Sequence, residues 1–190
     1  MSSAFNTHNT NPLSHYPQAW ERAGKVKLLV LDVDGVLTNG QVWIGADGKE
    51  SLKAFDIQDG LGIKLLEQCG IPTVIITGRN SKMVLARSEE LGIKHVHMGV
   101  ENKALALEEV LKALGLKSSD CAVMGDDWPD LAMMKNAGFR IAPFQAHEAV
   151  KEFVHFVTNR TGGDSAVREA CDLILKSQNC YDELLNKARQ

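Results

Sequence analysis

Short runs of aliphatic and β-branched residues recur along the chain. The strongest lie at 25–32, 73–77 and 122–124, and each is nearly continuous. Runs of this kind are typical of β-strands that are buried on both faces. Weaker candidates lie at 95–98, 139–142 and 155–157. The hydrophobic pattern therefore predicts a sheet whose strands are covered on both sides.

Between these runs, leucine, valine and isoleucine recur with helical spacing. Three such segments end at Gly70, Gly92 and Gly115, and a glycine in this place is a common helix C-cap. Strands that alternate with helices of this length imply right-handed crossovers and a parallel sheet. The sequence therefore predicts an α/β, doubly wound (Rossmann-like) domain.

One segment interrupts this alternation. Residues 41–55 hold two extended stretches around Ala-Asp-Gly, which predicts a β-hairpin that projects from the end of the first strand. Residues 1–24 are polar and lack periodicity, so we expect a disordered or loosely packed arm. The α/β domain is expected at 25–177, followed by a short polar helical tail at 178–190.

The composition argues against nucleic acid and membranes as binding partners. The 190 residues are 44% hydrophobic and 24% charged, with a formal net charge of -3. Such a chain offers no general basic field for nucleic acid or an anionic membrane, and no apolar run approaches the length of a membrane span. The N-terminus does not resemble a secretory signal, and the four cysteines form no C-x-x-C pair. We expect a cytoplasmic protein without a disulfide framework or zinc site.

Polar residues follow the three strongest strands, where ligands of open α/β sheets bind. Several are carboxylates, which would repel one another unless a cation neutralised them, and hard carboxylate oxygens suit Mg²⁺. The residues are Asp32 and Asp34 after the first strand, Thr77, Gly78 and Arg79 after the second, Asp126, Asp127 and Asp130 after the third, and Lys103 at the start of a helix. The sequence thus predicts a magnesium site at this edge.

In their order and spacing, these motifs resemble those of the haloacid dehalogenase (HAD) superfamily phosphatases. D-x-D-G-V-x-T, T-G-R, a lysine before a helix and G-D-D-x-x-D cover roughly residues 26–177. The segments 52–55, 59–63, 75–79 and 162–169 further resemble the 3-deoxy-D-manno-octulosonate 8-phosphate (KDO 8-phosphate) phosphatases. Ser165 stands where that family usually has a third glycine.

The two carboxylates of D-x-D have separate expected roles. Asp32 is placed to attack phosphorus in line and form an aspartyl-phosphate. Asp34, two residues on, can protonate the departing alcohol and then deprotonate the water that hydrolyses the intermediate. The resemblance implies a phosphate monoester as the substrate, and both carboxylates would act on it at the same strand end.

The resemblance also implies a division of labour among the other residues. It assigns Mg²⁺ to the Asp32 carboxylate, the Asp34 backbone carbonyl and Asp126, with Asp127 and Asp130 orienting these ligands or holding Lys103. Phosphoryl oxygens would meet the hydroxyl and backbone N–H of Thr77, the Lys103 ammonium and backbone amides freed by the small Gly78.

No cap domain is expected over this site. Only 42 residues separate Asp34 from Thr77, and 22 separate Lys103 from Asp126. The apolar hairpin would instead be buried by association with another subunit, where it would cover a neighbour's site. By resemblance the assembly is a homo-oligomer, most simply a tetramer; the alternative is a hairpin that folds back onto its own domain.

The resemblance implies Mg²⁺-dependent hydrolysis of KDO 8-phosphate, in lipopolysaccharide precursor biosynthesis. The carboxylate of this phosphorylated sugar acid needs a cation, and arginine suits a planar carboxylate. The candidate substrate-binding residues are Asp34, Phe55, Asp59, Arg79, Arg87, Lys103 and Arg168.

Alternative functions remain at this point. The nearest is a phosphatase for the 9-phosphate of a nine-carbon sugar acid. A receiver-type signalling domain also has an acidic pocket, a Thr and a Lys, but it carries its phosphoacceptor on a later strand and has no D-x-D-G. The intact pair of Asp32 and Asp34 disfavours a non-catalytic subunit, and no phosphate-binding G-x-x-x-x-G-K-[ST] loop is present.

Overall fold

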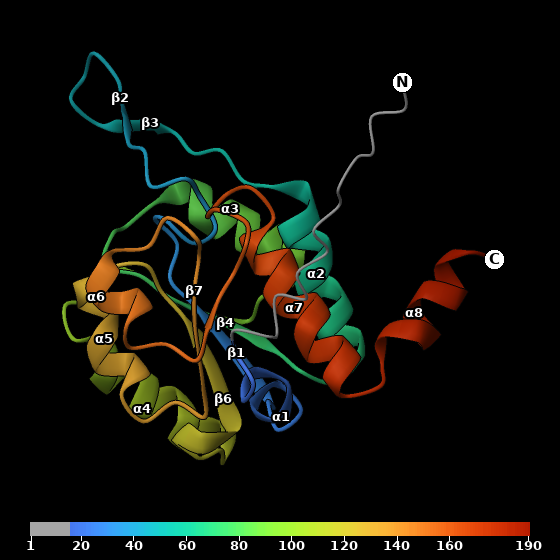
Figure 1. The fold of residues 1–190 in the computed structure, drawn as a ribbon. Coiled ribbons are helices and arrows are strands. Elements are labelled where there is room, and N and C mark those ends of the chain that lie inside the picture. Colours follow the sequence, from blue (N-terminus) through green and yellow to red (C-terminus); the bar gives the residue numbers. More distant parts are fainter. Residues whose placement is uncertain (1–15) are drawn as a thin grey trace, which may run out of the picture.

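The computed structural model describes residues 16–190, which form an α/β domain around one six-stranded parallel sheet (Figure 1). The strand order is β5-β4-β1-β6-β7-β8, and every neighbouring pair is parallel. The strands are β1 Leu28–Leu31, β4 Thr73–Ile76, β5 His95–His97, β6 Cys121–Met124, β7 Phe139–Ala142 and β8 Phe156–Val157. All six predicted strands are therefore confirmed, the weaker candidates included.

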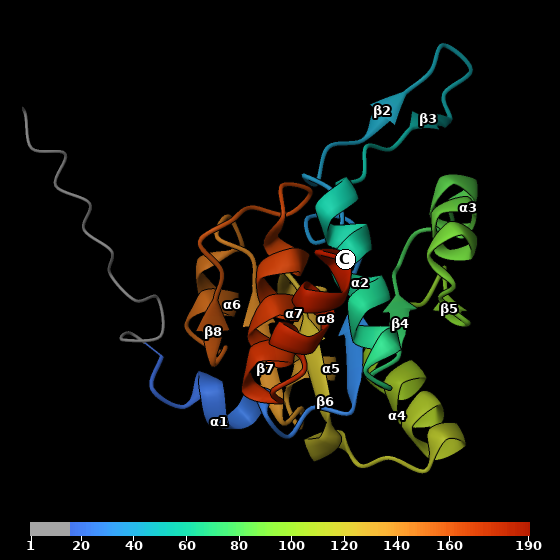
Figure 2. The same ribbon diagram turned by 90° about the vertical axis from the view of Figure 1, so that its right-hand side faces the viewer.

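Helices cover both faces of this sheet, with α4, α5 and α6 on one side and α2 and α7 on the other (Figures 1 and 2). In β1, Leu29 and Leu31 pack into the core beneath α2 and α7, whereas Leu28 and Val30 pack into the core beneath α4 and α5. The helices are α1 Ala19–Ala23, α2 Ile57–Gln68, α3 Lys82–Leu91, α4 Lys103–Leu114, α5 Trp128–Met134, α6 Glu148–Lys151, α7 Ala166–Ser177 and α8 Tyr181–Ala188.

Two glycines inside α2 explain how closely its neighbours approach. A Cβ on Gly60 would lie 2.3 Å from the guanidinium of Arg87 in α3, and one on Gly62 would lie 3.1 Å from both Arg168 and Cys171 in α7. Each glycine costs the helix up to about 1 kcal/mol of intrinsic propensity. That cost is offset by the close packing of α2 between α3 and α7.

The N-terminal part of the domain begins earlier than the sequence predicted. Residues 1–15 lie outside the described residues, but the expectation of a loose arm is wrong for 16–24. Ala19 and Ala23, one helical turn apart, are fully buried in α1, and the Tyr16 ring packs edge-on against Phe156 at 5.4 Å. The polar composition of this stretch obscured two alanines whose small side chains allow α1 to pack against α7.

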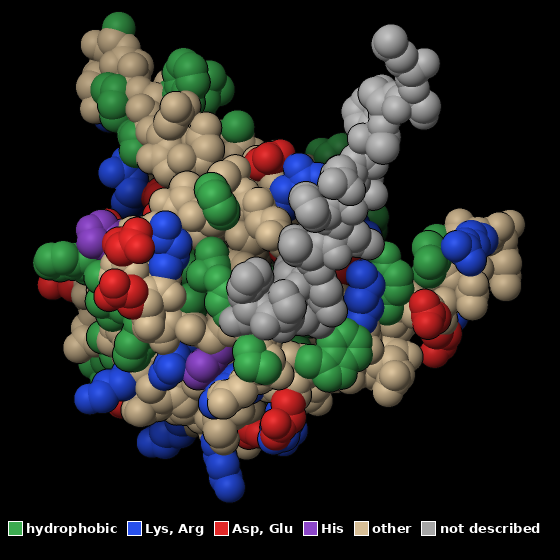
Figure 3. Space-filling view, in the orientation of Figure 1, with side chains coloured by type: hydrophobic (Ala, Val, Ile, Leu, Met, Phe, Trp, Pro, Cys, Tyr) green, Lys and Arg blue, Asp and Glu red, His purple; other side chains and the backbone are tan. Residues whose placement is uncertain are grey.

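The hairpin consists of β2 Trp43–Ile44 and β3 Glu50–Leu52, and it extends away from the domain rather than folding back on it (Figures 1 and 2). Its apolar side chains are conspicuous on the surface (Figure 3), and Trp43, Ile44 and Leu52 are 55%, 60% and 63% exposed. Neither short insertion holds a cap domain in the part of the chain described here. Within residues 16–190, no helix has both the length and the apolar character needed to cross a membrane.

Candidate active site

The loop after β1 brings the first predicted carboxylate to the centre of the sheet edge. Asp32 is 6% exposed, and its backbone N–H donates to the carbonyl of Met124 at the end of β6. Gly35 follows with a φ of +85°, and a Cβ there would lie 2.0 Å from Oδ2 of Asp126. Glycine at this position therefore permits both the left-handed turn and the close approach of the Asp126 carboxylate.

A buried lysine joins two of the predicted carboxylates. Lys103 Nζ lies 2.8 Å from Oδ1 of Asp32, as an ion pair, and 2.7 Å from Oδ1 of Asp130, to which it donates a hydrogen bond. Oδ2 of Asp130 accepts the backbone N–H groups of Asp126 and Asp127 at 2.9 and 3.3 Å. Both oxygens of Asp130 are thus engaged, and this side chain fixes the positions of Lys103 and the loop after β6.

The neighbouring carboxylate has a different place. Asp127 is exposed and caps α5 by accepting the Trp128 backbone N–H at 2.8 Å. It therefore faces its own helix, whereas Asp126 faces the loop after β1. Of the three acidic residues in G-D-D-x-x-D, only Asp126 and Asp130 approach Asp32.

The acidic cluster can accept a divalent cation. Asp32, Asp126 and Asp130 offer carboxylate oxygens that all lie within 4.8 Å of one another. Burial, and then the neighbouring carboxylates, raise the pKa of Asp32 to about 6 and that of Asp126 to about 7. Oδ1 of Asp32 is buried and, apart from its ion pair with Lys103, has no hydrogen-bond partner among the described residues. A hard dication would relieve both the desolvation and the repulsion, so these residues fit the predicted Mg²⁺.

The second strand end provides a buried hydroxyl. Thr77 is 2% exposed at the end of β4, and its backbone N–H donates to the carbonyl of His97 in the sheet ladder. The prediction that this N–H faces a phosphoryl group is therefore wrong, because the neighbouring strand β5 already uses it. The hydroxyl of Thr77 and the N–H of Gly78 remain as the candidate phosphate-binding groups of this turn.

Charged residues of the hairpin base and of the turn after β4 surround Asp34. Arg79 is half exposed, and its guanidinium lies 3.7 Å from both Asp34 and Glu50. Lys53, whose side chain is 1% exposed, forms an ion pair with Oδ1 of Asp34 and lies 2.8 Å from Oε1 of Glu50. Sequence reasoning assigned no role to Lys53 or Glu50. Two signals pointed to Lys53: a lysine within the apolar exit of the hairpin, and its place in the segment 52–55 that carries the family resemblance.

Two predicted substrate-binding residues are engaged in contacts between helices. Asp59 is 1% exposed, and its Oδ1 accepts the backbone N–H of Arg168 at 2.7 Å, so it does not line a sugar path. Arg87 donates to the backbone carbonyl of Asp56 and to Glu90, which ties α3 to the start of α2. Phe55 is partly buried against the core. Asp59 and Arg87 are drawn into contacts between helices because α2 lies between α3 and α7, whereas a role for Phe55 in binding substrate stays a prediction.

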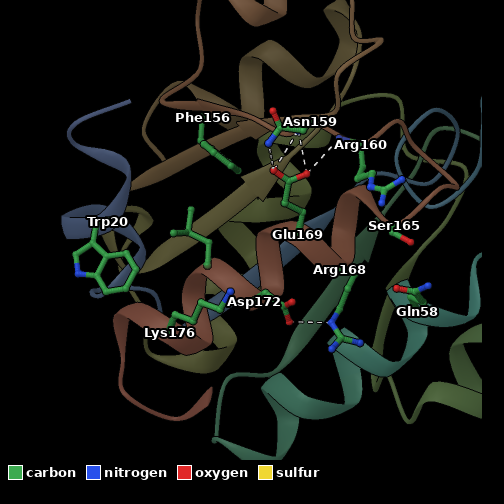
Figure 4. Close-up of a pocket in the computed structure, with 11 residues that line it drawn as sticks. Trp20, Gln58, Phe156, Asn159, Arg160, Ser165, Arg168, Glu169, Asp172 and Lys176 are labelled. Atoms are coloured by element: carbon green, nitrogen blue, oxygen red, sulfur yellow. Dashed lines mark hydrogen bonds and ion pairs between the residues drawn. The ribbon is translucent and has the colours of Figure 1, made fainter. Parts of the chain in front are cut away.

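Arg168 lies beside a groove along α7 that is separate from the acidic cluster. The groove has a volume of about 510 Å³ and runs past Ser165 and Lys176 (Figure 4). Its wall contains an ion pair between Arg168 and Asp172 at 2.7 Å and a set of hydrogen bonds from Asn159 to Glu169. Among the described residues, Arg168 therefore faces this groove instead of the site at the strand ends.

Comparison with known proteins agrees with this geometry. Residues 99–170 match the family of haloacid dehalogenase-like hydrolases. The chain is 40% identical over 167 residues to the 3-deoxy-D-manno-octulosonate 8-phosphate phosphatase of Salmonella typhimurium, covering 88% of each protein.

Two solved structures are similar over nearly the whole chain. The 3-deoxy-D-manno-octulosonate 8-phosphate phosphatase of Moraxella catarrhalis, in complex with magnesium ion, phosphate ion and KDO, has a TM-score of 0.88 and 44% identity, covering 92% of this chain and 99% of its own. The Yersinia pestis phosphatase of the same name has a TM-score of 0.85 and 39% identity, covering 87% and 89%.

Proposed function

This chain belongs to the 3-deoxy-D-manno-octulosonate 8-phosphate phosphatases of the haloacid dehalogenase-like hydrolases, and from that membership we infer that it hydrolyses KDO 8-phosphate to KDO and inorganic phosphate. This reaction belongs to lipopolysaccharide precursor biosynthesis. The observation that carries the inference is the meeting of Asp32, Lys103 and Asp126 at the carboxyl ends of β1 and β6. The Mg²⁺ bound by the Moraxella catarrhalis relative suits the same carboxylates.

Asp32 acts as the nucleophile in this mechanism. Its oxygen forms a bond to phosphorus while the bond between phosphorus and the sugar oxygen breaks, which yields an aspartyl-phosphate and the free alcohol. Lys103, 2.8 Å from the carboxylate, holds Asp32 in place and adds positive charge beside the phosphoryl oxygens. Thr77 and Gly78 contribute a hydroxyl and a backbone N–H on the other side.

Asp34 moves the proton. In its acid form it gives its proton to the leaving sugar oxygen, and as a carboxylate it then takes a proton from the water that attacks the aspartyl-phosphate. Hydrolysis releases inorganic phosphate and regenerates the free Asp32 carboxylate, so the enzyme returns to its starting state. Asp32, Asp126 and the Asp34 backbone carbonyl would hold Mg²⁺, which would neutralise negative charge that otherwise opposes the approach of carboxylate and phosphate.

Recognition of the sugar acid is assigned first to Arg79. It is 48% exposed and only 3.7 Å contacts join it to Asp34 and Glu50. Arg87 and Arg168, in contrast, form closer ion pairs with Glu90 at 2.8 Å and Asp172 at 2.7 Å. A guanidinium can bind a carboxylate through two parallel hydrogen bonds. Arg79 is therefore the arginine placed to select a substrate that carries a carboxylate.

We assign the projecting hairpin to subunit association. An isolated two-stranded hairpin is at best marginally stable in water, and this one exposes Trp43, Ile44 and Leu52. A homo-oligomer, most simply a tetramer, would bury these side chains and cover the open site of a neighbour. The protein would act in the cytoplasm, where its soluble sugar phosphate is made and used.

A substrate panel tests the proposed function. Purified protein with Mg²⁺ is assayed on KDO 8-phosphate, a nine-carbon sugar-acid 9-phosphate, glucose 6-phosphate and 4-nitrophenyl phosphate. We expect kcat/KM for KDO 8-phosphate to exceed that for glucose 6-phosphate by roughly ten- to a hundredfold, because loss of one charged contact costs about 1.5 to 3 kcal/mol. Equal values for the two esters would contradict selection by the carboxylate.

Light scattering tests the association. We expect a mass several times that of one subunit at micromolar concentration, and a shift towards the monomer when Trp43 and Ile44 are both replaced by serine. A wild-type protein that is monomeric under these conditions would refute the role assigned to the hairpin.

A further inference from the structure

A compact cluster of alternating charges joins the base of the hairpin to the catalytic loop. The Lys53 ammonium lies between Oδ1 of Asp34, with which it forms an ion pair, and Oε1 of Glu50 at 2.8 Å. Arg79 closes the cluster on its exposed side, 3.7 Å from each of the two carboxylates. Two positive and two negative groups thus meet beside the loop after β1.

The members of this cluster come from different parts of the chain. Asp34 follows β1, Glu50 begins β3, and Lys53 lies one residue beyond β3, at the point where the hairpin returns to the domain. The Lys53 side chain is 1% exposed and that of Glu50 is 10% exposed, while Asp34 retains 21%. The buried end of the cluster is therefore the hairpin, and the accessible end is the carboxylate proposed to handle the proton.

This burial argues against a direct role for Lys53 in binding substrate. Its ammonium is enclosed, and two carboxylates already compensate its charge, whereas Arg79 is the exposed cation of the same cluster. Nor is stability a sufficient reason for such a cluster, since buried ion pairs often contribute little net free energy compared with apolar side chains. A lysine held in this way restricts the orientation of the carboxylate that it contacts.

We propose that Lys53 is a positioning residue that orients the Asp34 carboxylate toward the leaving-group oxygen, and that Glu50 anchors Lys53 in turn. This inference rests on the proposed function, in which Asp34 is the general acid and base. A carboxylate that is free to rotate spends less time aligned for proton transfer, and small misplacements lower rates strongly. The base of the hairpin thereby becomes part of the machinery that releases the sugar.

The test compares two phosphate esters, only one of which has a leaving group that must be protonated. The alcohol released from KDO 8-phosphate requires a proton, whereas 4-nitrophenolate leaves without one. In a Lys53→Met variant, single-turnover release of KDO should slow roughly ten- to a hundredfold. The pre-steady-state burst of 4-nitrophenolate should keep its rate within about twofold, because Asp32 and its surroundings are unchanged.

Three further variants support the interpretation. Lys53→Arg, which retains the charge, should recover part of the KDO release rate. Lys112→Met removes an exposed lysine of α4, away from both the hairpin and the site, and should match the wild type. The double variant Glu50→Gln/Lys53→Met removes the carboxylate that Lys53→Met would leave buried, so a folded protein without Lys53 is available; circular dichroism and light scattering verify folding and assembly.

The outcomes distinguish this inference from the proposed function. Asp34→Asn should abolish hydrolysis of KDO 8-phosphate; if it does not, the acid–base role of Asp34 fails, and the inference fails with it. If Asp34→Asn is inactive but Lys53→Met slows both esters equally, or neither, the positioning role is wrong while the proposed function stands. A rise in KM for KDO 8-phosphate at unchanged single-turnover rate would make Lys53 a substrate-binding residue and overturn the inference.

Discussion

Asp59 in α2 caps α7 across the interface between the two helices: its Oδ1 accepts the backbone N–H of Arg168 at 2.7 Å. The residue before α7, Ser165, adopts a left-handed φ of +67° and makes no capping hydrogen bond to its own helix. Its hydroxyl instead donates to Asp56 at 3.2 Å. The first turn of α7 therefore depends on a carboxylate that is distant in sequence, and that carboxylate is almost completely buried.

Replacement of Asp59 should change how stability depends on pH. Burial is the main cause that raises the pKa of Asp59 to about 7, against an ordinary value of about 4 in the unfolded chain. Between these values the folded state binds more protons, so the free energy of unfolding falls as pH rises and this loss is complete above pH 7. Relative to wild type, Asp59→Asn should therefore gain stability between pH 5 and pH 8, by up to about 4 kcal/mol.

Urea unfolding of both proteins at pH 5, 6, 7 and 8, without metal, measures this difference. Asparagine can still accept the Arg168 N–H through its side-chain oxygen, so the cap is retained. Asp182→Asn, an exposed position on α8, is the matched control and should show no such trend. A stability difference between Asp59→Asn and wild type that stays constant with pH would contradict the raised pKa.

Asp32→Asn should abolish turnover without unfolding the protein. The amide cannot form an acyl phosphate by in-line attack, and we expect turnover to fall by several orders of magnitude. Lys103 keeps its hydrogen bond to Asp130, so the melting temperature should change little. Phosphate release and differential scanning calorimetry measure the two effects; near-wild-type turnover would exclude Asp32 as the nucleophile.

Lys103→Met should destabilise the domain as well as inactivate it. The lysine is 6% exposed and compensates two carboxylates, so its removal leaves buried charge at a cost of about 3 to 5 kcal/mol. Lys94→Met is the comparison, because Lys94 forms only a solvent-exposed pair with Glu67 and should cost less than about 1 kcal/mol. Equal losses in urea unfolding would contradict the structural role of Lys103.

Mg²⁺ should stabilise the wild type more than it stabilises the Asp126→Asn variant. Without metal the variant gains stability, since a carboxylate with a pKa raised by burial and by neighbouring acids is removed. On addition of Mg²⁺ the melting temperature of the variant should rise much less than that of the wild type, because one metal ligand is missing. Melting temperatures in EDTA and in millimolar Mg²⁺ test this, with Asp127→Asn as the control that retains the full Mg²⁺ effect.

Gly162→Ala should disturb the site from outside it. A Cβ at this position would lie 1.9 Å from the backbone oxygen of Gly35, so the loop after Asp34 must shift. We expect a loss of more than about 2 kcal/mol in urea unfolding together with reduced turnover. Gly24→Ala is the control, because its Cβ would meet ordinary contacts at 3.5 Å and its φ is -66°; similar losses in both variants would contradict this explanation.

The sequence alone determined the sheet and the meeting of its strand ends. Strand β1 is apolar at every position because both of its faces are buried, and this local property is visible without any structure. Parallel strands place their carboxyl ends at one edge, so the approach of Asp32 to Asp126 follows from the fold class. Periodicity and strand direction are encoded locally, and they account for the part of the site that could be predicted.

Only the tertiary structure decided which partner each remaining charged side chain meets. Asp59 and Arg168 meet at the interface between α2 and α7. Lys53 contacts Asp34 from the base of the hairpin. Ala19 and Ala23 anchor a segment whose composition suggested a loose arm. No local pattern specifies these contacts, because their free energy depends on the burial and geometry created when distant segments pack together. A long charged side chain can reach several partners, and the packed interior determines which of them it reaches.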